Sequence, residues 1–255
     1  MAILETHHLS RRYGSLVALD DLNLKVEAGE CFGFIGPNGA GKTTTIKILA
    51  TLLKPSSGEA RVCGFTVGWQ NTHIRPLIGY VPDFLGAYDD MLVREYLQFF
   101  ASCYGITGSR RTQVVDDALS LTDLGSKAEA PISGLSRGMS QRLAVARVLL
   151  HDPEVLLLDE PASGLDPRAR VEMRELLRTL RDLGKTILIS SHILHELAEL
   201  CTSVGILERG KLVFAGSVQS ALDAARSGTR LECELDGGMD AVSYTHLRAH
   251  ETRTN

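Results

Sequence analysis

The segment Gly36-Pro-Asn-Gly-Ala-Gly-Lys42-Thr43 limits the possible folds of this chain more than any other. It fits the pattern G-x-x-x-x-G-K-[ST], in which glycines let successive backbone N–H groups curl around a phosphate. A buried strand should precede such a loop, and a helix should follow it with its positive end toward the anion. The apolar run at residues 31–35 supplies the strand, and a helix is predicted over about residues 41–53. We therefore expect a nucleotide-binding α/β core.

Composition excludes several other classes of protein. The chain has 255 residues, 44% of them hydrophobic, which indicates one or two compact globular units. A net charge of −4 with mixed signs argues against a nucleic-acid partner. No apolar run approaches the roughly 20 residues that span a bilayer, and the first residues lack the features of a signal peptide. The scattered cysteines contain no C-x-x-C pair, so we expect reduced thiols in the cytosol and neither zinc nor disulfides. They are Cys31, Cys63, Cys103, Cys201 and Cys233.

Short apolar runs outline the rest of the fold. Residues 22–26 alternate as in a half-buried strand, whereas residues 78–81, 155–158 and 186–189 read as buried strands of a parallel sheet. Residues 204–207 and 212–214 predict a hairpin, and residues 84–150 predict a mostly helical insert. Within that insert a helical stripe is predicted from Tyr96, Phe99, Phe100 and Cys103. The expected fold class is α/β: a P-loop NTPase core with a mostly parallel sheet, an antiparallel β subdomain and an inserted helical subdomain.

The last residues form a separate case. Residues 242–252 match, residue by residue, the translation of a common transposase-type sequencing adapter. We expect residues 242–255 to be a sequencing artefact and the native chain to continue past about residue 241. Residues 229–235 resemble the first strand of that continuation.

Two carboxylates follow the predicted strand at residues 155–158. Asp159 is expected to hold Mg²⁺ through water, because Mg²⁺ gives up its water reluctantly, and Glu160 to act as general base on the attacking water. Lys42 should reach the β- and γ-phosphates, the Thr43 hydroxyl should bind Mg²⁺, and Thr44 should lie near the α-phosphate. The predicted nucleotide-binding residues of the loop are Gly36, Asn38, Gly39, Gly41, Lys42, Thr43 and Thr44.

The order of these motifs, with Leu135-Ser-Arg-Gly-Met139 between them, resembles the nucleotide-binding subunit of an ATP-binding cassette (ABC) transporter over about residues 3–235. The resemblance makes this segment the signature loop, whose Ser136 and Gly138 contact the γ-phosphate bound by an opposite subunit. The chain departs from the usual L-S-G-G-Q at Arg137 and Met139. Because a methionine side chain cannot donate the hydrogen bond of a glutamine, weaker polar contact is expected there.

The same resemblance assigns further residues. Ser163 and Asp166 match the loop that crosses the dimer, His192 matches the switch histidine at the γ-phosphate, and Tyr13 matches the aromatic residue that stacks on adenine. Asp83 stands where the family usually has a glutamine that couples Mg²⁺ and the lytic water to the membrane partner. Two interpretations of Asp83 stay open: it senses Mg²⁺ with altered coupling, or it caps the helix that follows.

Three functions compete at this point. Residues 84–97 together with the signature loop resemble the subfamily that exports drugs, antibiotics, polysaccharides or sodium. Soluble ABC proteins of translation carry two cassettes in one chain, and those of DNA repair carry a long insert before the signature loop; the compact segment between Lys42 and Ser136 disfavours both. A plain P-loop kinase or GTPase would need no signature loop, which disfavours that function too. The favoured function is an exporter ATPase at the cytoplasmic face of the cell membrane, with ATP and Mg²⁺, a second ATPase subunit as in a homodimer, and a separate transmembrane permease. The ATPase domain is expected at residues 1–241, with a helical subdomain at about 84–150 and a C-terminal extension starting at about 217.

Overall fold

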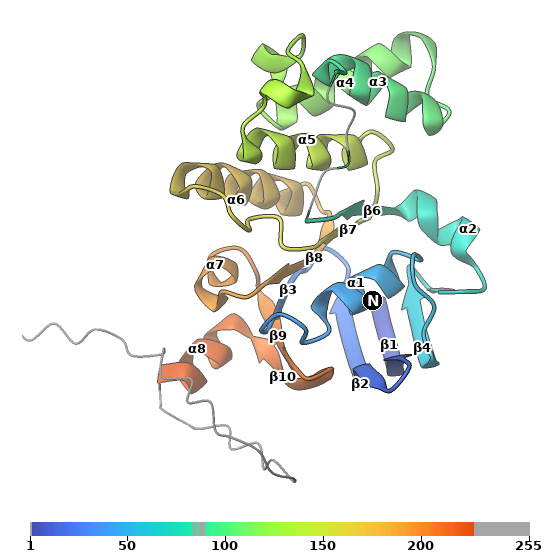
Figure 1. Ribbon diagram of the computed structural model, residues 1–255, viewed down its shortest axis with the longest axis vertical. Coiled ribbons are helices and arrows are strands. Elements are labelled where there is room, and N and C mark those ends of the chain that lie inside the picture. The colour runs from blue at the N-terminus through green and yellow to red at the C-terminus, as the bar shows by residue number, and fades with distance from the viewer. Residues whose placement is uncertain (1, 84–85, 87–89, 227–255) are drawn as a thin grey trace, which may run out of the picture.

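Two β-sheets and a set of helices build the computed structural model, which describes residues 2–83, 86 and 90–226 (Figure 1). The predicted adapter segment at residues 242–255 and the predicted strand at residues 229–235 lie outside the described residues. The strands are β1 (Ala2–Tyr13), β2 (Leu16–Glu27), β3 (Cys31–Ile35), β4 (Ser57–Val62), β5 (Phe65–Thr66), β6 (Ile78–Val81), β7 (Val155–Leu158), β8 (Thr186–Ser191), β9 (Ser203–Glu208) and β10 (Lys211–Ser217). The helices are α1 (Lys42–Leu49), α2 (Asn71–Ile74), α3 (Val93–Cys103), α4 (Gly108–Leu121), α5 (Arg137–Leu149), α6 (Pro167–Asp182), α7 (Leu194–Ala198) and α8 (Val218–Arg226). Short 3₁₀ turns lie at Arg75–Leu77, Gly125–Lys127 and Ile132–Gly134.

The larger sheet has the strand order β10-β9-β3-β8-β7-β6. Its central pairings, β9 with β3, β3 with β8, β8 with β7 and β7 with β6, are all parallel, and only β10 runs antiparallel, to β9. The carboxyl ends of β3, β8, β7 and β6 therefore meet at one edge, where ligands bind in open α/β sheets. The second sheet, β2-β1-β4-β5, is antiparallel. The predicted combination of a mostly parallel sheet, an antiparallel part and a helical insert is confirmed.

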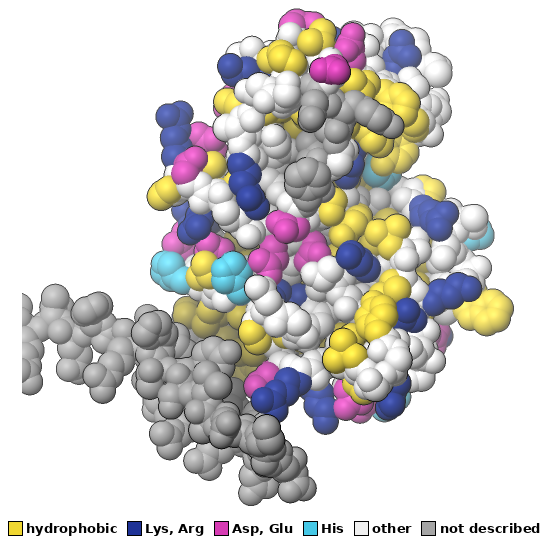
Figure 2. All heavy atoms as spheres, in the orientation of Figure 1, with side chains coloured by type: hydrophobic (Ala, Val, Ile, Leu, Met, Phe, Trp, Pro, Cys, Tyr) yellow, Lys and Arg dark blue, Asp and Glu magenta, His cyan; other side chains and the backbone are white. Residues whose placement is uncertain are grey.

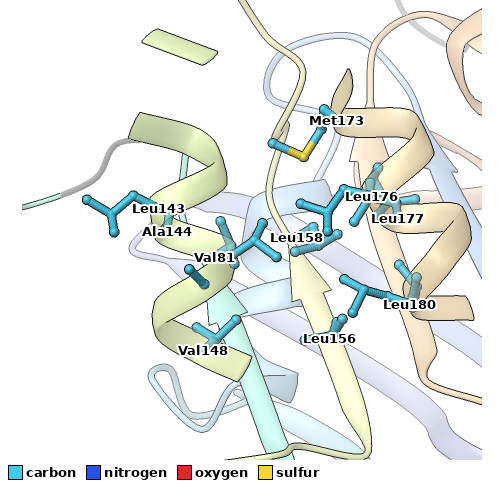
Figure 3. Close-up of a cluster of buried hydrophobic side chains, with 14 of the residues drawn as sticks. Val81, Leu143, Ala144, Val148, Leu156, Leu158, Met173, Leu176, Leu177 and Leu180 are labelled. Carbon is cyan, nitrogen blue, oxygen red and sulfur yellow. The ribbon is translucent and has the colours of Figure 1, made fainter. Parts of the chain in front are cut away.

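Burial on both faces explains why the strands read as continuous apolar runs. All four residues of β7 are buried, but they divide between two cores. Leu156 and Leu158 pack with the core that contains α5 and α6, as Figure 3 shows, whereas Val155 and Leu157 pack with the core that contains α1 and the antiparallel sheet. The larger sheet is thus the middle layer of three.

Helices α3 and α4 lie beyond α5 and form the helical part of the insert (Figure 1). The predicted apolar stripe of α3 is partly wrong. Tyr96 is buried together with Leu97 and Ala101, but Phe99 is 49% exposed and Cys103 is also exposed. Helices α4 and α5 pack against α3 and determine which of its faces is buried. The positions of apolar residues in the sequence do not show which helices will pack there.

The helix predicted over residues 41–53 ends at Leu49, earlier than predicted. Thr51 has a φ of 61°, and its N–H bonds to the Ile48 carbonyl, while the Leu52 N–H bonds to the Lys47 carbonyl. This pair of bonds is a Schellman ending, usually made with glycine at the left-handed position. A threonine there gives no sequence signal for the helix end. Across residues 2–83, 86 and 90–226, no helix is long and apolar enough to span a bilayer.

Candidate active site

The edge formed by the carboxyl ends of the parallel strands collects most of the predicted site residues. The Gly36 loop follows β3, Asp159 and Glu160 follow β7, and His192 follows β8. Acidic side chains gather near the centre of one face of the molecule, between the helical layer and the sheets (Figure 2). Strand order therefore brings together segments that are more than 100 residues apart in sequence.

The phosphate loop needs glycine where neighbouring backbone comes closest. A Cβ on Gly36 would lie 2.3 Å from the Leu207 carbonyl oxygen. Gly41 has a φ of 111°, and a Cβ there would lie 2.7 Å from the Leu19 side chain. Asn38 and Gly39 are exposed at the turn of the loop. The loop is thus pressed against β2 and β9, and its outer turn faces solvent.

Lys42, the first residue of α1, is only 4% exposed and points back into the loop. Its ammonium donates hydrogen bonds to the carbonyls of Gly36, at 2.6 Å, and Pro37, at 3.1 Å. The same nitrogen lies 3.2 Å from Oε1 of Glu160. A buried cation requires such partners, and here they join the phosphate loop to the Glu160 carboxylate, which follows β7.

The side-chain oxygens of Thr43 and Asp159 lie next to each other and could both bind a metal ion. The Thr43 hydroxyl donates to Oδ1 of Asp159 at 3.0 Å, and Asp159 is 4% exposed. The Ser190 hydroxyl donates to the same carboxylate oxygen at 2.9 Å and accepts the backbone N–H of Glu160 at 2.9 Å. A hydroxyl beside a carboxylate is a donor set that suits Mg²⁺. Thr44, half-buried, follows on the same turn of α1.

Glu160 sits in a strained backbone conformation between two partners. Its φ is 49°, in the left-handed region that residues other than glycine seldom adopt, and such strain concentrates at functional sites. One carboxylate oxygen faces Lys42, and the other lies 3.1 Å from Nδ1 of His192. The structure therefore joins His192, which was predicted to contact phosphate, directly to the predicted base.

The predicted signature loop and dimer loop pack against each other. Ser136 caps α5 by accepting the Met139 N–H at 3.3 Å, and Asp166 caps α6 by accepting the Ala169 N–H at 2.9 Å. A Cβ on Gly138 would lie 2.6 Å from Cβ of Ala169. The helix starts thus touch, and Ser163 lies in the loop between β7 and α6, with its N–H bonded to the Glu160 carbonyl.

Asp83, two residues after the end of β6, has contacts that neither interpretation of it included. Its carbonyl accepts a hydrogen bond from the buried Gln141 side chain at 2.7 Å, and its carboxylate lies 3.8 Å from the Arg137 guanidinium. Burial and the neighbouring carboxylates of Asp159 and Asp83 raise the pKa of Tyr80 to about 12. Because β6 pairs in parallel with β7, Asp83 and Asp159 both follow strands that end at the same edge of the sheet.

Tyr13 lies at the far end of the β1–β2 hairpin, 45% exposed. The same hairpin touches the phosphate loop, because Leu19 of β2 packs against Gly41. The Arg11 guanidinium lies 4.6 Å from the centre of the Tyr13 ring and covers one of its faces. Tyr13 thus lies on the hairpin that touches the phosphate loop, with one face of its ring covered by Arg11.

Sequence reasoning missed Ser190, which holds Asp159 and Glu160 together. Its signal is its place in β8, two residues before His192, on the strand next to β7. The sequence also gave no sign of the contact between Arg137 and Gly164: a Cβ on Gly164 would lie 2.8 Å from Cζ of Arg137.

Comparison with known proteins agrees with this geometry. The profile of the family described as ABC transporter matches residues 19–163. The chain is 41% identical over 224 residues to the Nod factor export ATP-binding protein I of Burkholderia pseudomallei (strain 1710b), covering 88% of this chain and 74% of that protein. It is 38% identical over 223 residues to the protein of the same name from Cupriavidus metallidurans, with the same coverage.

Solved structures give the same result. One described as the structure of the ATP binding subunit of an ABC transporter is 30% identical, with a TM-score of 0.76, over 88% of this chain and 92% of that one. A second, cbiO1 from Clostridium perfringens, part of the ABC transporter complex cbiONQ, is 28% identical with a TM-score of 0.79, over 89% and 94%.

Proposed function

Because the chain belongs to the ABC transporter family and carries its ATP-hydrolysing domain, we propose that it is the motor subunit of an exporter, with the residues around Lys42 and Glu160 as its hydrolytic site. The observation that carries this assignment is the contact between the two motifs. Lys42 Nζ lies 3.2 Å from Glu160, and the Thr43 hydroxyl lies 3.0 Å from Asp159. Phosphate-binding and carboxylate groups thus form one unit.

The loop residues bind the nucleotide in this proposal. Backbone N–H groups of residues 36–44 and the N-terminus of α1 surround the phosphates, and Lys42 exchanges its carbonyl partners for β- and γ-phosphate oxygens. Tyr13 stacks on adenine with the ring face opposite Arg11, because Arg11 already covers one face.

Magnesium fits the donors beside the loop. We assign it to Thr43 and Asp159, whose oxygens are adjacent, with Asp83, which follows the neighbouring strand β6, as a further candidate ligand. When bound, Mg²⁺ neutralises charge that develops on the transferred phosphate. Ser190 keeps the Asp159 carboxylate oriented toward Thr43.

Glu160 acts as the general base that polarises the attacking water, and His192 holds that carboxylate in place. In the proposed cycle His192 also contacts the γ-phosphate. Its Nδ1 faces Glu160, which leaves Nε2 of the ring for a phosphate oxygen.

A second copy of the chain completes the site. Ser136 and Gly138 stand at the start of α5, where the helix end favours an anion, and they would contact the γ-phosphate held by the opposite subunit. Ser163 and Asp166 would cross the same interface. ATP then acts as a ligand that favours the closed pair, since it binds the closed state more tightly.

The ATPase subunits of ABC transporters work with a membrane subunit and usually dimerise. The two curated relatives bear names that assign them to Nod factor export, and the identity of 38–41% supports an export role for this chain. We assign the chain to the cytoplasmic face of the membrane, bound to a separate permease. A role in translation or DNA repair is not favoured.

The Glu160→Gln variant tests the assignment. Because glutamine keeps the size but cannot accept a proton, ATP hydrolysis should fall by about 10²–10⁴-fold, while ATP still binds and still drives dimerisation. ATPase assays and size-exclusion chromatography with ATP measure both. Glu129→Gln, an exposed change in the helical part, is the matched control and should keep full activity. Hydrolysis at the wild-type rate in Glu160→Gln would rule out the base.

A further inference from the structure

The first residue of α5 carries a charge that its position disfavors. Arg137 occupies the first turn of a helix whose N-terminus favours negative groups, and that turn contains no acidic residue. Its side chain is more than half exposed, but its guanidinium contacts neighbouring loops. It reaches away from α5 to two other loops, one after β6 and one after β7.

The loop after β7 provides a seat for the guanidinium. Gly164 has a φ of 67°, and a Cβ built on it would lie 2.8 Å from Cζ, 3.0 Å from Nη1 and 3.1 Å from Nε of Arg137. These three atoms belong to one planar group, so the plane lies against the bare α-carbon of Gly164. Neither a side chain at residue 164 nor a bulky non-planar cation at residue 137 would fit this contact.

The loop after β6 provides the opposite charge. Nη2 of Arg137 lies 3.8 Å from Oδ1 of Asp83, and both side chains are more than half exposed. An exposed pair at this distance contributes little to stability. It is therefore easily broken and remade, which suits a link between segments that move and not one that holds the fold.

We propose that Arg137 is a positioning residue for ATP hydrolysis. Its guanidinium packs on Gly164 and pairs with Asp83, so it connects the Ser136 loop with the loop after β6 and the loop after β7. Ser136 is its immediate neighbour, and Gly164 lies four residues after Glu160. A shift of Asp83 or of the Glu160 loop is thus passed to the residues that face the second subunit. This inference rests on the proposed site, because it concerns how that site is held.

The test is a double-mutant cycle on the purified chain. Arg137→Ala should lower kcat for ATP about three- to tenfold, with the Kd for ATP and the melting temperature unchanged, because Arg137 supports neither the phosphate loop nor the core. Asp83→Asn should lower kcat as well. The kcat of the double variant should be no lower than that of the slower single variant, since both substitutions remove the same contact between Arg137 and Asp83. Arg137→Lys keeps the charge but not the plane, so partial recovery is expected.

The control is Arg110→Ala, an exposed arginine in the first turn of α4, which should keep wild-type kcat. Strictly additive effects of the two single variants, or a wild-type kcat in Arg137→Ala, would overturn the link. A joint fall of melting temperature and ATP affinity in Arg137→Ala would also overturn it, because that result marks a purely structural residue. Absence of ATP hydrolysis in the unmodified chain would instead contradict the proposed function.

Discussion

At the scale of single residues, Lys42 combines two tasks in one ammonium group. It is almost fully buried, and its hydrogen bonds to the carbonyls of Gly36 and Pro37 hold the shape of the phosphate loop. In the proposed function the same ammonium group binds the phosphates. The nearby Glu160 carboxylate balances its charge. Loop shape and phosphate affinity therefore depend on the same side chain.

Lys42→Ala should raise the Kd for ATP by about 10- to 100-fold, because the variant loses a hydrogen bond to a charged phosphate group. Titration with ATP followed by calorimetry measures the change. Lys47→Ala, an exposed lysine on the same helix, is the control and should bind ATP like the unmodified chain. Equal affinity in the two variants would contradict the role of Lys42.

His151 predicts a dependence of stability on pH. Burial lowers its pKa below the ordinary 6.5, against the opposing effect of its hydrogen bond to the Ile78 carbonyl. With Nε2 on that carbonyl, Nδ1 is buried without a hydrogen-bond partner in the described structure, so a second proton has no acceptor. Below about pH 6.5 the unfolded chain takes up a proton more readily than the folded one, and the free energy of unfolding should decrease as pH falls toward the lowered pKa.

Urea unfolding at pH 7.5 and pH 5.5 checks this prediction. His151→Gln keeps a donor but does not titrate, so the part of the pH dependence that comes from this residue should vanish. Because several carboxylates also titrate at lower pH, the difference between the unmodified chain and the variant is the quantity to compare. An unchanged difference between the two pH values in the variant would exclude His151 as the cause.

The phosphate-loop pattern and the carboxylates after a buried strand predicted Lys42, Thr43, Asp159 and Glu160 as site residues, and the family resemblance added His192. Each follows a strand that the apolar runs reveal, and parallel strands end at one edge. Partners that join the loops could not be predicted the same way. Ser190 and Arg137 act through contacts between segments far apart in sequence, and nothing local marks a serine or an arginine for such a contact.

At the scale of elements, α5 and α6 approach each other closely where the predicted signature and dimer loops meet. The starts of α5 and α6 are close enough that a Cβ on Gly138 would collide with Ala169. Farther along, buried Arg142 pairs with Glu172 and fixes the same two helices together. The geometry of Ser136 is thus set by how closely α6 packs.

Gly138→Ala should force these helices apart, with a cost of about 1–3 kcal/mol from overpacking. Ala169→Gly removes the opposing methyl group, so the double variant Gly138→Ala/Ala169→Gly should recover most of the lost stability and ATPase activity. Thermal unfolding and ATPase rates measure both. If the double variant is no better than Gly138→Ala alone, the collision is not the cause of the loss.

Strands were predicted more accurately than helix faces and ends. The limits of β3, β6 and β7 agree with the apolar runs, since a strand buried on both faces leaves an uninterrupted signal. The face of α3 and the end of α1 were wrong. The buried face of α3 depends on which helices pack against it, and the sequence of α3 alone does not show this. The Schellman ending of α1 has Thr51 at the position where glycine usually marks the end of a helix.

At the scale of the whole molecule, the arrangement predicts that one copy is insufficient. In the proposed function, each site combines the Lys42 cluster of one chain with the Ser136 loop of another, so a single chain would lack half of each site. Hydrolysis per chain should therefore rise with protein concentration and level off once the ATP-bound pair predominates. ATPase rates over a hundredfold range of concentration measure this, and a constant rate per chain would contradict a shared site.

The way α5 is held has a mechanical consequence. Just past its far end, His151 is stacked on Tyr104 of the loop after α3 and bonded to Ile78 of β6, while its near end carries Ser136. A helix of 13 residues is a stiff rod about 20 Å long. A tilt of about 5° around the anchored end swings the other end by about 1.7 Å, more than the margin between a made and a lost hydrogen bond. In the proposed function, a small rotation of α5 together with the packed α6 would therefore change the contact of Ser136 with the γ-phosphate held by a second subunit.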